Sequence, residues 1–491
     1  MSVETQRAPR LFPLARPAGL EPWLLGALML GGAALRFSTL DLQSFWHDEA
    51  VTVGRVLAPG LGATLGHVPS SEATPPLYYA LAWLWTKVFG SGEVGIRSLS
   101  ALFGIATIPV AWWAGRALVS RAAGLGAAAL VAVSPYMVWY SQEARAYALL
   151  VLLCAASLGF FAEAMRRQGG RSLGWWALVS ALALLTHYFA IFVVAPEAAI
   201  LLWLLPERRR AVAAATAGVA VVGAALIPLA VHQADRGHDG WIAQISLGTR
   251  IKDTGRQFLL GYSGSPSRAL SVVVALLALG AGGLTLRHAL RSRDRGWWLV
   301  LAIAVAALAL PLAAKAVGAD YVFHRNLIGA WAPLALVVGT AAAVPRFGPM
   351  ALAGLCAALL ALTIAVDVDT KLQRADWRSV ARAIGGAPQP RAVVAPSIGD
   401  DPLAYYLPGR TTIERGRASP RVSEIYVVGF TAAPRSAARR VPAGFVRGGR
   451  TRVGAFTIVA YVAAAPRVVA RARLAEARLG MGHAAVLVQA R

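Results

Sequence analysis

The sequence of 491 residues is 57% hydrophobic and only 15% charged. This composition excludes an ordinary soluble protein of that length and predicts a polytopic membrane protein. Its 48 basic residues, almost all of them arginine, outnumber 24 acidic ones. Because alanine and glycine are abundant as well, this bias points to a GC-rich genome rather than to a nucleic-acid partner. Both cysteines, Cys154 and Cys356, lie in apolar segments, so no disulfide framework is expected.

Apolar segments of about 20 residues, the length that crosses a bilayer, recur along residues 22–370. They lie near residues 22–39, 94–115, 122–140, 146–165, 211–231, 268–286, 296–316, 326–344 and 348–366. The apolar stretch 172–205 is too long for one span, and basic residues flank both of its ends. We therefore expect a hairpin of two helices that turns near His187. The prediction is an all-α transmembrane domain of about 11 helices.

With this number of spans, the arginine-rich connections all fall on one side, which the positive-inside rule assigns to the cytoplasm. The segment 1–21, with Arg7, Arg10 and Arg16, would then be cytoplasmic. The first apolar segment has the character of a retained signal anchor. Nearly all histidines and most acids at membrane level fall on the opposite side. Ionisable residues at that depth are costly and by default indicate function.

The motif Trp46-His47-Asp48-Glu49-Ala50 directly follows the first predicted span. It places two adjacent carboxylates and an imidazole at the mouth of a membrane-buried region. An alternative is that the acids merely cap a short helix, because Asp and Glu favour first turns. The motif opens a long outer loop, 41–93. Residues 76–89 of this loop are apolar but too short to span, which favours an interfacial helix.

Residues 371–491 contain no spanning segment and form a predicted small C-terminal α/β domain. We expect a helix at 376–384 and strands at 392–395, 425–428 and 456–462. An odd number of crossings would make this domain extracytoplasmic. It holds 20 basic and 6 acidic residues, a net charge of +14. Codon usage and attraction to an anionic headgroup or polymer are both open explanations of this charge.

Six blocks in this order resemble a known family: WHDEA (46–50), TPPLYYALAWLW (74–85), EVGIRSLSALFGIATIPVAWWAGRAL (93–118), SPYMVWYSQEARAYALL (134–150), THYF (186–189) and DWRSVARAI (376–384). The chain is similar to bacterial membrane glycosyltransferases of the GT-C fold. Within these it resembles the protein O-mannosyltransferase and aminoarabinose-transferase superfamily, also described as glycosyltransferase family 39-like. The resemblance covers about residues 20–370 and the beginning of the C-terminal region.

This resemblance implies an enzyme that transfers a sugar, with inversion, from a polyprenyl-phosphate carrier. The acceptor would be a protein, lipid or polysaccharide at the outer face of the bacterial plasma membrane. The family's catalytic base matches Asp48, and basic residues near membrane level bind the lipid phosphate. The family's RYLLP-type segment corresponds here to His324-Arg325-Asn326-Leu327, in which Asn replaces the aromatic residue.

Inverting transfer needs a base and positive charge for the departing phosphate. We assign Asp48 as the base. Glu49 points elsewhere, because neighbours on a helix diverge by about 100°, and would orient the acceptor, bind a sugar hydroxyl or cap the helix. Arg145 and Arg325 are candidate phosphate contacts, with snorkelling at the bilayer edge as the alternative. The further substrate-binding candidates are His47, Tyr78, Glu143, Tyr140, His187 and His324.

No cofactor is certain. A divalent metal at His47, Asp48 and Glu49, or at His232 and His238, is an open alternative without diagnostic spacing. The absence of a P-loop and of GxGxxG after a strand argues against a nucleotide-sugar donor. A transporter or lipid-carrier flippase is the main alternative function, although such proteins usually show internal repeats, which we do not find. A third possible function is that of a catalytically inactive scaffold that binds the lipid carrier.

Overall fold

The structure is a computed structural model that describes residues 19–166, 170–237, 240–412, 419–431, 440–480 and 482–489. The expected cytoplasmic segment 1–21 and its three arginines lie almost entirely outside these residues. The chain divides into two compact units. The membrane unit contains residues up to 38 together with 68–88 and 96–372, and the second unit contains 39–67, 89–95 and 373–491. This division splits the loop 41–93 between the two units.

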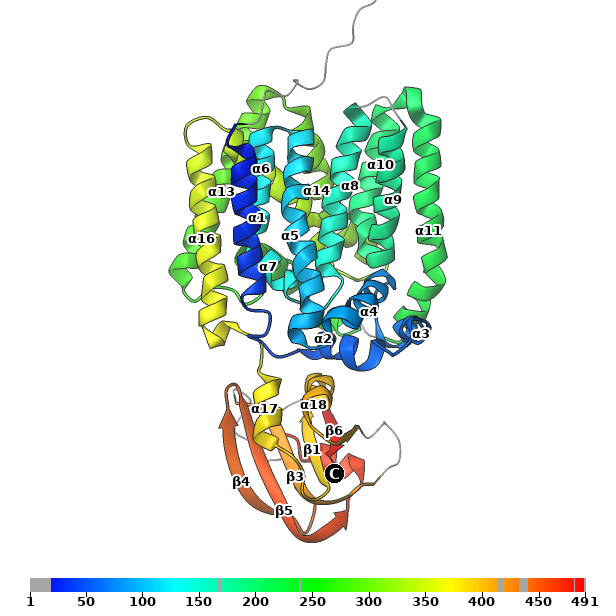
Figure 1. Cartoon of the computed structure of the whole chain (residues 1–491), viewed down its shortest axis with the longest axis vertical. Helices are drawn as coiled ribbons and strands as arrows, with labels where there is room; N and C mark the ends of the chain where they lie inside the picture. The colour runs from blue at the N-terminus through cyan, green and yellow to red at the C-terminus, as the bar shows by residue number, and fades with distance from the viewer. Residues whose placement is uncertain are drawn as a thin grey trace, which may run out of the picture. The chain divides into compact units, whose positions relative to one another are not determined.

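The membrane unit is a helical bundle whose long helices run side by side (Figure 1). Its helices are α1 (Glu21–Phe37), α4 (Leu77–Phe89), α5 (Glu93–Leu118), α6 (Arg121–Val133), α7 (Pro135–Ser141), α8 (Tyr147–Arg166), α9 (Arg171–Thr186), α10 (Ile191–Leu204), α11 (Arg209–Asp235), α12 (Leu247–Leu260), α13 (Arg268–Ser292), α14 (Arg295–Ala316), α15 (Trp331–Gly339) and α16 (Gly348–Val368). The predicted hairpin is confirmed as α9 and α10, joined by a short turn at Tyr188–Ala190. The predicted short helix at 76–89 is α4.

Six helices of the described residues are long and apolar enough to cross a membrane, or seven if the bent pair α6–α7 counts as one span. Shorter apolar helices, including α9, add to the bundle. The predicted number of 11 spans is therefore not confirmed, whereas the multi-pass character is. The predicted span at 326–344 is a continuous but shorter apolar helical run, Ile328–Ala343, in which α15 lies between two 3-10 turns.

The bend of 61° between α6 and α7 has a local cause. Pro135 has no N–H and disfavours helical geometry at Ser134, so α6 ends at Val133. The carbonyl oxygens that this leaves near the end of α6 accept hydrogen bonds from the buried guanidinium of Arg36, at 2.8 Å to Val131 and 3.0 Å to Ala132. A cation at a helix C-terminus is also favourable for the helix dipole.

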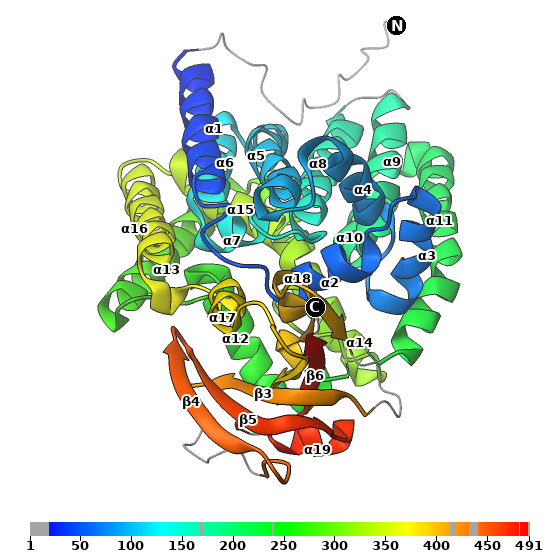
Figure 2. The ribbon, with the colours of Figure 1, turned by 60° about the horizontal axis from the view of Figure 1, so that its bottom comes forward.

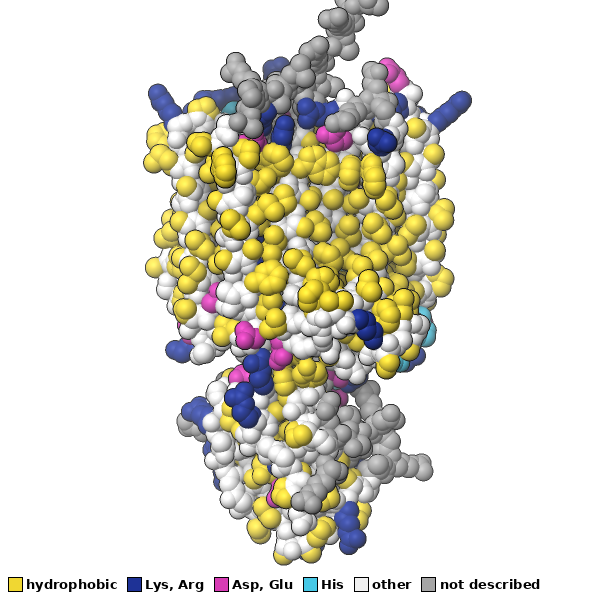
Figure 3. Space-filling view, viewed as in Figure 1, with side chains coloured by type: hydrophobic (Ala, Val, Ile, Leu, Met, Phe, Trp, Pro, Cys, Tyr) yellow, Lys and Arg dark blue, Asp and Glu magenta, His cyan; other side chains and the backbone are white. Residues whose placement is uncertain are grey.

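The face of the bundle that Figure 3 shows is largely apolar, as expected of a lipid-facing surface. Trp23, Trp203, Leu279 and Met350 are all at least 70% exposed. Such a large continuous apolar surface indicates contact with a membrane. Lys and Arg side chains gather at one end of the bundle in the same view.

Glycine permits one very close helix contact inside the bundle. A Cβ at Gly126 of α6 would lie 2.1 Å from the Gly339 carbonyl oxygen of α15, and a Cβ at Gly339 would lie 2.4 Å from the backbone nitrogen of Ala127. Small residues of this kind let membrane helices approach closely and pack their backbones together.

The second unit is built on a six-stranded sheet in the order β2-β6-β1-β3-β5-β4. Its strands are β1 (Arg391–Pro396), β2 (Arg410–Thr412), β3 (Arg421–Phe430), β4 (Val446–Val453), β5 (Phe456–Val468) and β6 (Ala484–Gln489). β1 and β3 pair in parallel and the other pairs are antiparallel. The three predicted strands are confirmed as β1, β3 and β5.

Helices cover both faces of this sheet (Figure 2). α17 (Trp377–Ile384), the predicted helix, packs with α18 (Asp400–Tyr406) against one face. α19 (Arg471–Glu476) packs against the other face, where Leu474 is fully buried. The same unit contains α2 (His47–Val51) and most of α3 (Leu61–Ser71).

The edge strand β4 carries three exposed arginines, Arg447, Arg450 and Arg452. A bulge between Arg447 and Gly449 shifts the register, so that all three oppose alternate residues of β5 and lie on one face. Charged residues on an edge strand discourage pairing with another chain. Part of the positive charge can thus protect the edge of the sheet. Codon usage and attraction to an anionic partner both stay open as explanations of the excess.

Candidate active site

The two carboxylates of the WHDEA motif lie in the first turn of α2 and have different surroundings. Asp48 is half-buried, whereas Glu49 is fully buried. Glu49 Oε2 accepts a 3.4 Å hydrogen bond from the backbone N–H of Trp46 and lies 3.1 Å from Arg374 Nη1. Glu49 therefore caps its own helix and pairs with an arginine, whereas the side chain of Asp48 is less buried.

His47 lies beside an acidic pair of α18. Its Nδ1 is 3.4 Å from Asp401 Oδ2, and Asp401 also accepts a hydrogen bond from Arg55 Nε at 2.5 Å. Burial, and then the charge of Asp401, raise the pKa of Asp400. α2 continues as one π-helical turn, Thr52–Val56, which carries Arg55. Such turns are frequent at functional sites.

In the membrane unit, Arg145 is buried between α7 and α8 and has a partner that the sequence analysis missed. Its Nη1 lies 2.6 Å from Oε1 of Glu72, which is itself buried, and its guanidinium lies 5.9 Å from the ring centre of Tyr79. Glu72 precedes the PPLYY block by only a few residues, and an acid in that position was the available signal. Tyr78 is fully buried, with its hydroxyl 3.2 Å from Ser100 Oγ.

Rings from separate segments gather next to this pair. Tyr140 lies 5.0 Å from Tyr147, which lies 6.0 Å from His187, measured between ring centres. The Tyr140 hydroxyl is 3.2 Å from Nδ1 of His324, and the Tyr136 hydroxyl donates to the His324 carbonyl oxygen at 2.9 Å. The structure thus brings together predicted residues from positions 140, 187 and 324.

Arg325 belongs to the same region. Its guanidinium lies 5.4 Å from the ring centre of Trp241 and 5.8 Å from that of Phe323. Arg325 directly follows His324, whose ring lies 4.2 Å from that of Phe323 between ring centres. Glu143 is buried in the turn that connects α7, which carries Tyr140, to Arg145. Two cations, two acids and a group of aromatic rings therefore form one polar site, whose arginines can bind an anionic group attached to a ring-shaped ligand.

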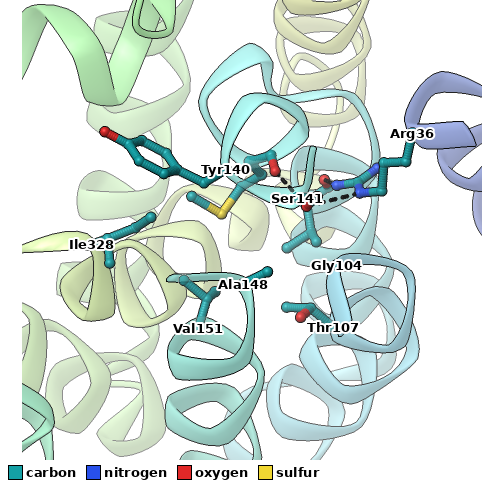
Figure 4. Close-up of a pocket in the computed structure, with 10 residues that line it drawn as sticks. Arg36, Gly104, Thr107, Tyr140, Ser141, Ala148, Val151 and Ile328 are labelled. Carbon is teal, nitrogen blue, oxygen red and sulfur yellow. Dashed lines mark hydrogen bonds between the residues drawn. The ribbon is translucent and has the colours of Figure 1, made fainter. Parts of the chain in front are cut away.

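A small cavity lies behind this site (Figure 4). Tyr140 and Ile328 line one side of it, and Arg36 reaches toward Ser141 on the other. Arg36 Nε donates to Ser141 Oγ at 3.2 Å, so hydroxyl and carbonyl oxygens satisfy this buried cation. Arg36 therefore has a structural role: it binds the carbonyl oxygens at the end of α6 where the bend to α7 begins.

Within the part of the chain that the structure describes, no three His, Cys, Asp or Glu side chains are arranged to hold a metal ion. His47 pairs with Asp401 rather than with the neighbouring acids of the motif, and His232 belongs to the last turn of α11. His238, the remaining metal candidate, lies outside the described residues.

Comparisons with known proteins agree with this architecture. The family model for dolichyl-phosphate-mannose-protein mannosyltransferase matches residues 73–233. The crystal structure of ArnT from Cupriavidus metallidurans in the apo state is similar, with a TM-score of 0.53 and 13% identity over 79% of this chain and 84% of that one. This chain has a GT-C fold of the protein mannosyltransferase and ArnT type.

The archaeal oligosaccharyltransferase AglB from Archaeoglobus fulgidus, in complex with an inhibitory peptide and a dolichol-phosphate, has the same fold, with a TM-score of 0.51 and 13% identity over 74% of this chain. This chain spans only 55–57% of the length of the archaeal oligosaccharyltransferases that it matches. The comparison with curated proteins finds no match. The segment matched by the family model includes Glu72's neighbours in the PPLYY block and Arg145, but neither Asp48 nor Arg325.

Proposed function

We propose that this GT-C protein is an inverting glycosyltransferase that moves a monosaccharide from a polyprenyl-phosphate carrier to an acceptor hydroxyl. The observation that carries the proposal is the contrast on α2: Asp48 is half-buried while its neighbour Glu49 is fully buried and paired. The fully buried carboxylate has a structural role in this proposal, and the half-buried one takes part in proton transfer.

The reaction would be a single displacement at the anomeric carbon. Asp48 accepts the proton of the acceptor hydroxyl as its oxygen bonds to that carbon. The bond from the carbon to the phosphate oxygen breaks, and the electron pair leaves with the polyprenyl phosphate. A well-placed base of this kind contributes about 10²–10⁴-fold in rate. No nucleophile of the protein and no redox step is required.

Arg145 and Arg325 would stabilise the phosphate as it departs, because guanidinium groups bind phosphate oxygens in pairs. Glu72 balances the charge of Arg145 before the donor arrives. Tyr140, Tyr147 and the two histidines offer ring faces and hydrogen bonds to a sugar. Tyr78 and Glu143 support this site from buried positions.

We further propose that the N-terminus is cytoplasmic and that the second unit is extracytoplasmic. Support comes from the arginines that gather at one end of the bundle, since cytoplasmic connections collect basic residues. The donor would then be used at the outer face of the membrane. The acceptor would be a protein, a lipid or a polysaccharide.

The test is purified protein in lipid with a panel of labelled polyprenyl-phosphate sugars. We expect the wild type to remove label from one donor and Asp48→Asn to bind that donor without turning it over, because this change keeps the shape of the side chain and removes the base. Equal behaviour of both proteins across the panel would exclude Asp48 as the base. Movement of the intact donor across the bilayer would favour a flippase.

A further inference from the structure

The segment that carries Asp48 is fastened on both sides by residues of the C-terminal part of the same unit. On its N-terminal side, the backbone N–H of Trp377 donates to Ser44 Oγ at 3.0 Å, and that of Phe45 donates to the hydroxyl of Tyr406 at 2.8 Å. The Phe45 ring is fully buried against Tyr405, at 5.1 Å between ring centres. The chain entering α2 is therefore fixed in its path by α17 and α18.

On the C-terminal side, Arg55 in the π-helical turn attaches the segment to α18. It binds Asp401 at 2.5 Å and Asp400 at 3.4 Å. His47, the residue just before Asp48, lies 3.4 Å from the same Asp401. One carboxylate of α18 thus contacts a residue on each side of Asp48.

Arg374 makes the central contact. Its Nη1 lies 3.1 Å from Glu49 Oε2, its backbone N–H donates to Gln43 Oε1 at 2.8 Å, and its guanidinium lies 5.5 Å from the ring centre of Trp46. Glu49 is fully buried and the side chain of Arg374 is only 9% exposed. Removing one partner of a buried ion pair leaves an uncompensated charge, which makes this contact the most sensitive of the set.

A second chain of contacts passes through Glu93. Tyr406 donates to Glu93 Oε1 at 2.5 Å, and Arg378 Nη2 lies 3.0 Å from the same oxygen. The accepting hydroxyl of Tyr406 is the one that binds Phe45 N–H. The entry of the catalytic segment and the start of α5 are thus tied to the same two helices.

We propose that the C-terminal region positions the catalytic base, with Arg374, Asp401 and Tyr406 as the positioning residues. They bind the residues before and after Asp48 and so set the direction of its carboxylate. This inference rests on the proposed role of Asp48, and it gives the C-terminal domain a part in the reaction of this chain. A base must be held to within a fraction of an ångström, and an error of 1 Å can cost about 10²-fold in rate.

The experiment compares Arg374→Gln, Arg374→Lys and the control Arg382→Gln in the full-length protein in lipid. Arg382 is exposed on α17, and Arg374 lies just before that helix, so replacing Arg382 removes the same charge from a nearby part of the same unit. Two quantities are measured: amide hydrogen exchange of residues 43–56, and kcat and KM for the donor that the wild type uses. If Arg374→Gln does not fold, Tyr406→Phe, which removes one hydroxyl, is the variant used to test the same proposal.

We expect Arg374→Gln to speed exchange in residues 43–56 at least tenfold and to lower kcat about 10²-fold, with KM within twofold of the wild type. Arg374→Lys should recover part of kcat, and Arg382→Gln should change neither quantity. Unchanged exchange in 43–56 would overturn the proposal, as would a loss of protection spread over the whole sheet, which would mean that Arg374 only maintains the domain.

The exchange measurement needs no substrate. If the wild type turns over no donor, the proposed function fails while the exchange of residues 43–56 still decides whether Arg374 holds this segment. If the wild type is active and exchange is unchanged in Arg374→Gln, the positioning inference alone fails.

Discussion

Arg145 places a positive charge in a buried position of the membrane unit, and Glu72 balances it at 2.6 Å. A buried charge without a partner is costly, so each member of the pair depends on the other. If the donor phosphate binds Arg145, it takes over the role of Glu72. Stability measured with and without a phosphate ligand therefore reports on this site.

We predict that Glu72→Gln lowers the free energy of unfolding by about 3–5 kcal/mol. Added polyprenyl phosphate should raise the melting temperature of Glu72→Gln more than that of the wild type, because it restores an anion beside Arg145. The control is Glu476→Gln, which breaks an exposed pair with Arg473. Equal stabilisation of wild type and Glu72→Gln would place the phosphate elsewhere.

Asp320 provides a pH-dependent contribution to stability. Its two oxygens accept hydrogen bonds from Arg250 at 2.7 and 2.8 Å, and Lys315 Nζ lies 3.0 Å away. The hydrogen bonds from Arg250 lower the pKa of Asp320 well below its usual value. Because the pKa is lower in the folded protein, the stabilisation is complete above the unfolded pKa of about 4 and is lost as the pH falls below it.

Asp320→Asn should therefore melt at a lower temperature than the wild type at pH 7, and the difference should shrink as the pH approaches 3. Thermal unfolding across this range measures it. A difference that stays constant with pH would show that Asp320 stabilises through packing alone.

At the scale of helices, the contact of α6 with α15 depends on two glycines that have no room for a side chain. We predict that Gly126→Ala lowers the melting temperature, because the new methyl group would clash with the backbone of Gly339. The control is Gly280→Ala on α13, where nothing lies within 4 Å. That change should be neutral or stabilising, since Ala favours a helix over Gly by up to about 1 kcal/mol. A Gly126→Ala protein as stable as the wild type would mean that α6 and α15 separate easily.

The helices were predictable where length and apolarity suffice, as in α8 and α13, and the hairpin α9–α10 followed from basic residues at both of its ends. The break between α6 and α7 was not predicted, although Ser134-Pro135 was the signal for it. Strand β4 was missed because its sequence, VRGGRTRV, has no alternation of apolar residues. Strand β6 was missed although its sequence, AAVLVQ, is apolar.

In the site, the residue types were predictable but their partners were not. Glu72 and Arg145 are separated by 73 residues, and Glu49 and Arg374 by 325. No local pattern joins such pairs, because tertiary packing brings them together. The sequence could therefore propose Asp48 and Arg145 and separate Asp48 from Glu49, while the ion pair that buries Glu49 became visible only in the structure.

For the molecule as a whole, the central claim is that a GT-C fold with the half-buried carboxylate of Asp48 on α2 performs glycosyl transfer. The most direct measurement is the release of polyprenyl phosphate per enzyme by wild type, Asp48→Asn and Glu49→Gln, with donor binding measured on the same samples. We predict that Asp48→Asn loses about 10²–10⁴-fold in kcat while it binds donor as the wild type does. Glu49→Gln should lose stability and retain measurable turnover. If Asp48→Asn releases polyprenyl phosphate at the wild-type rate, or if only Glu49→Gln is inactive among well-folded proteins, the claim is wrong.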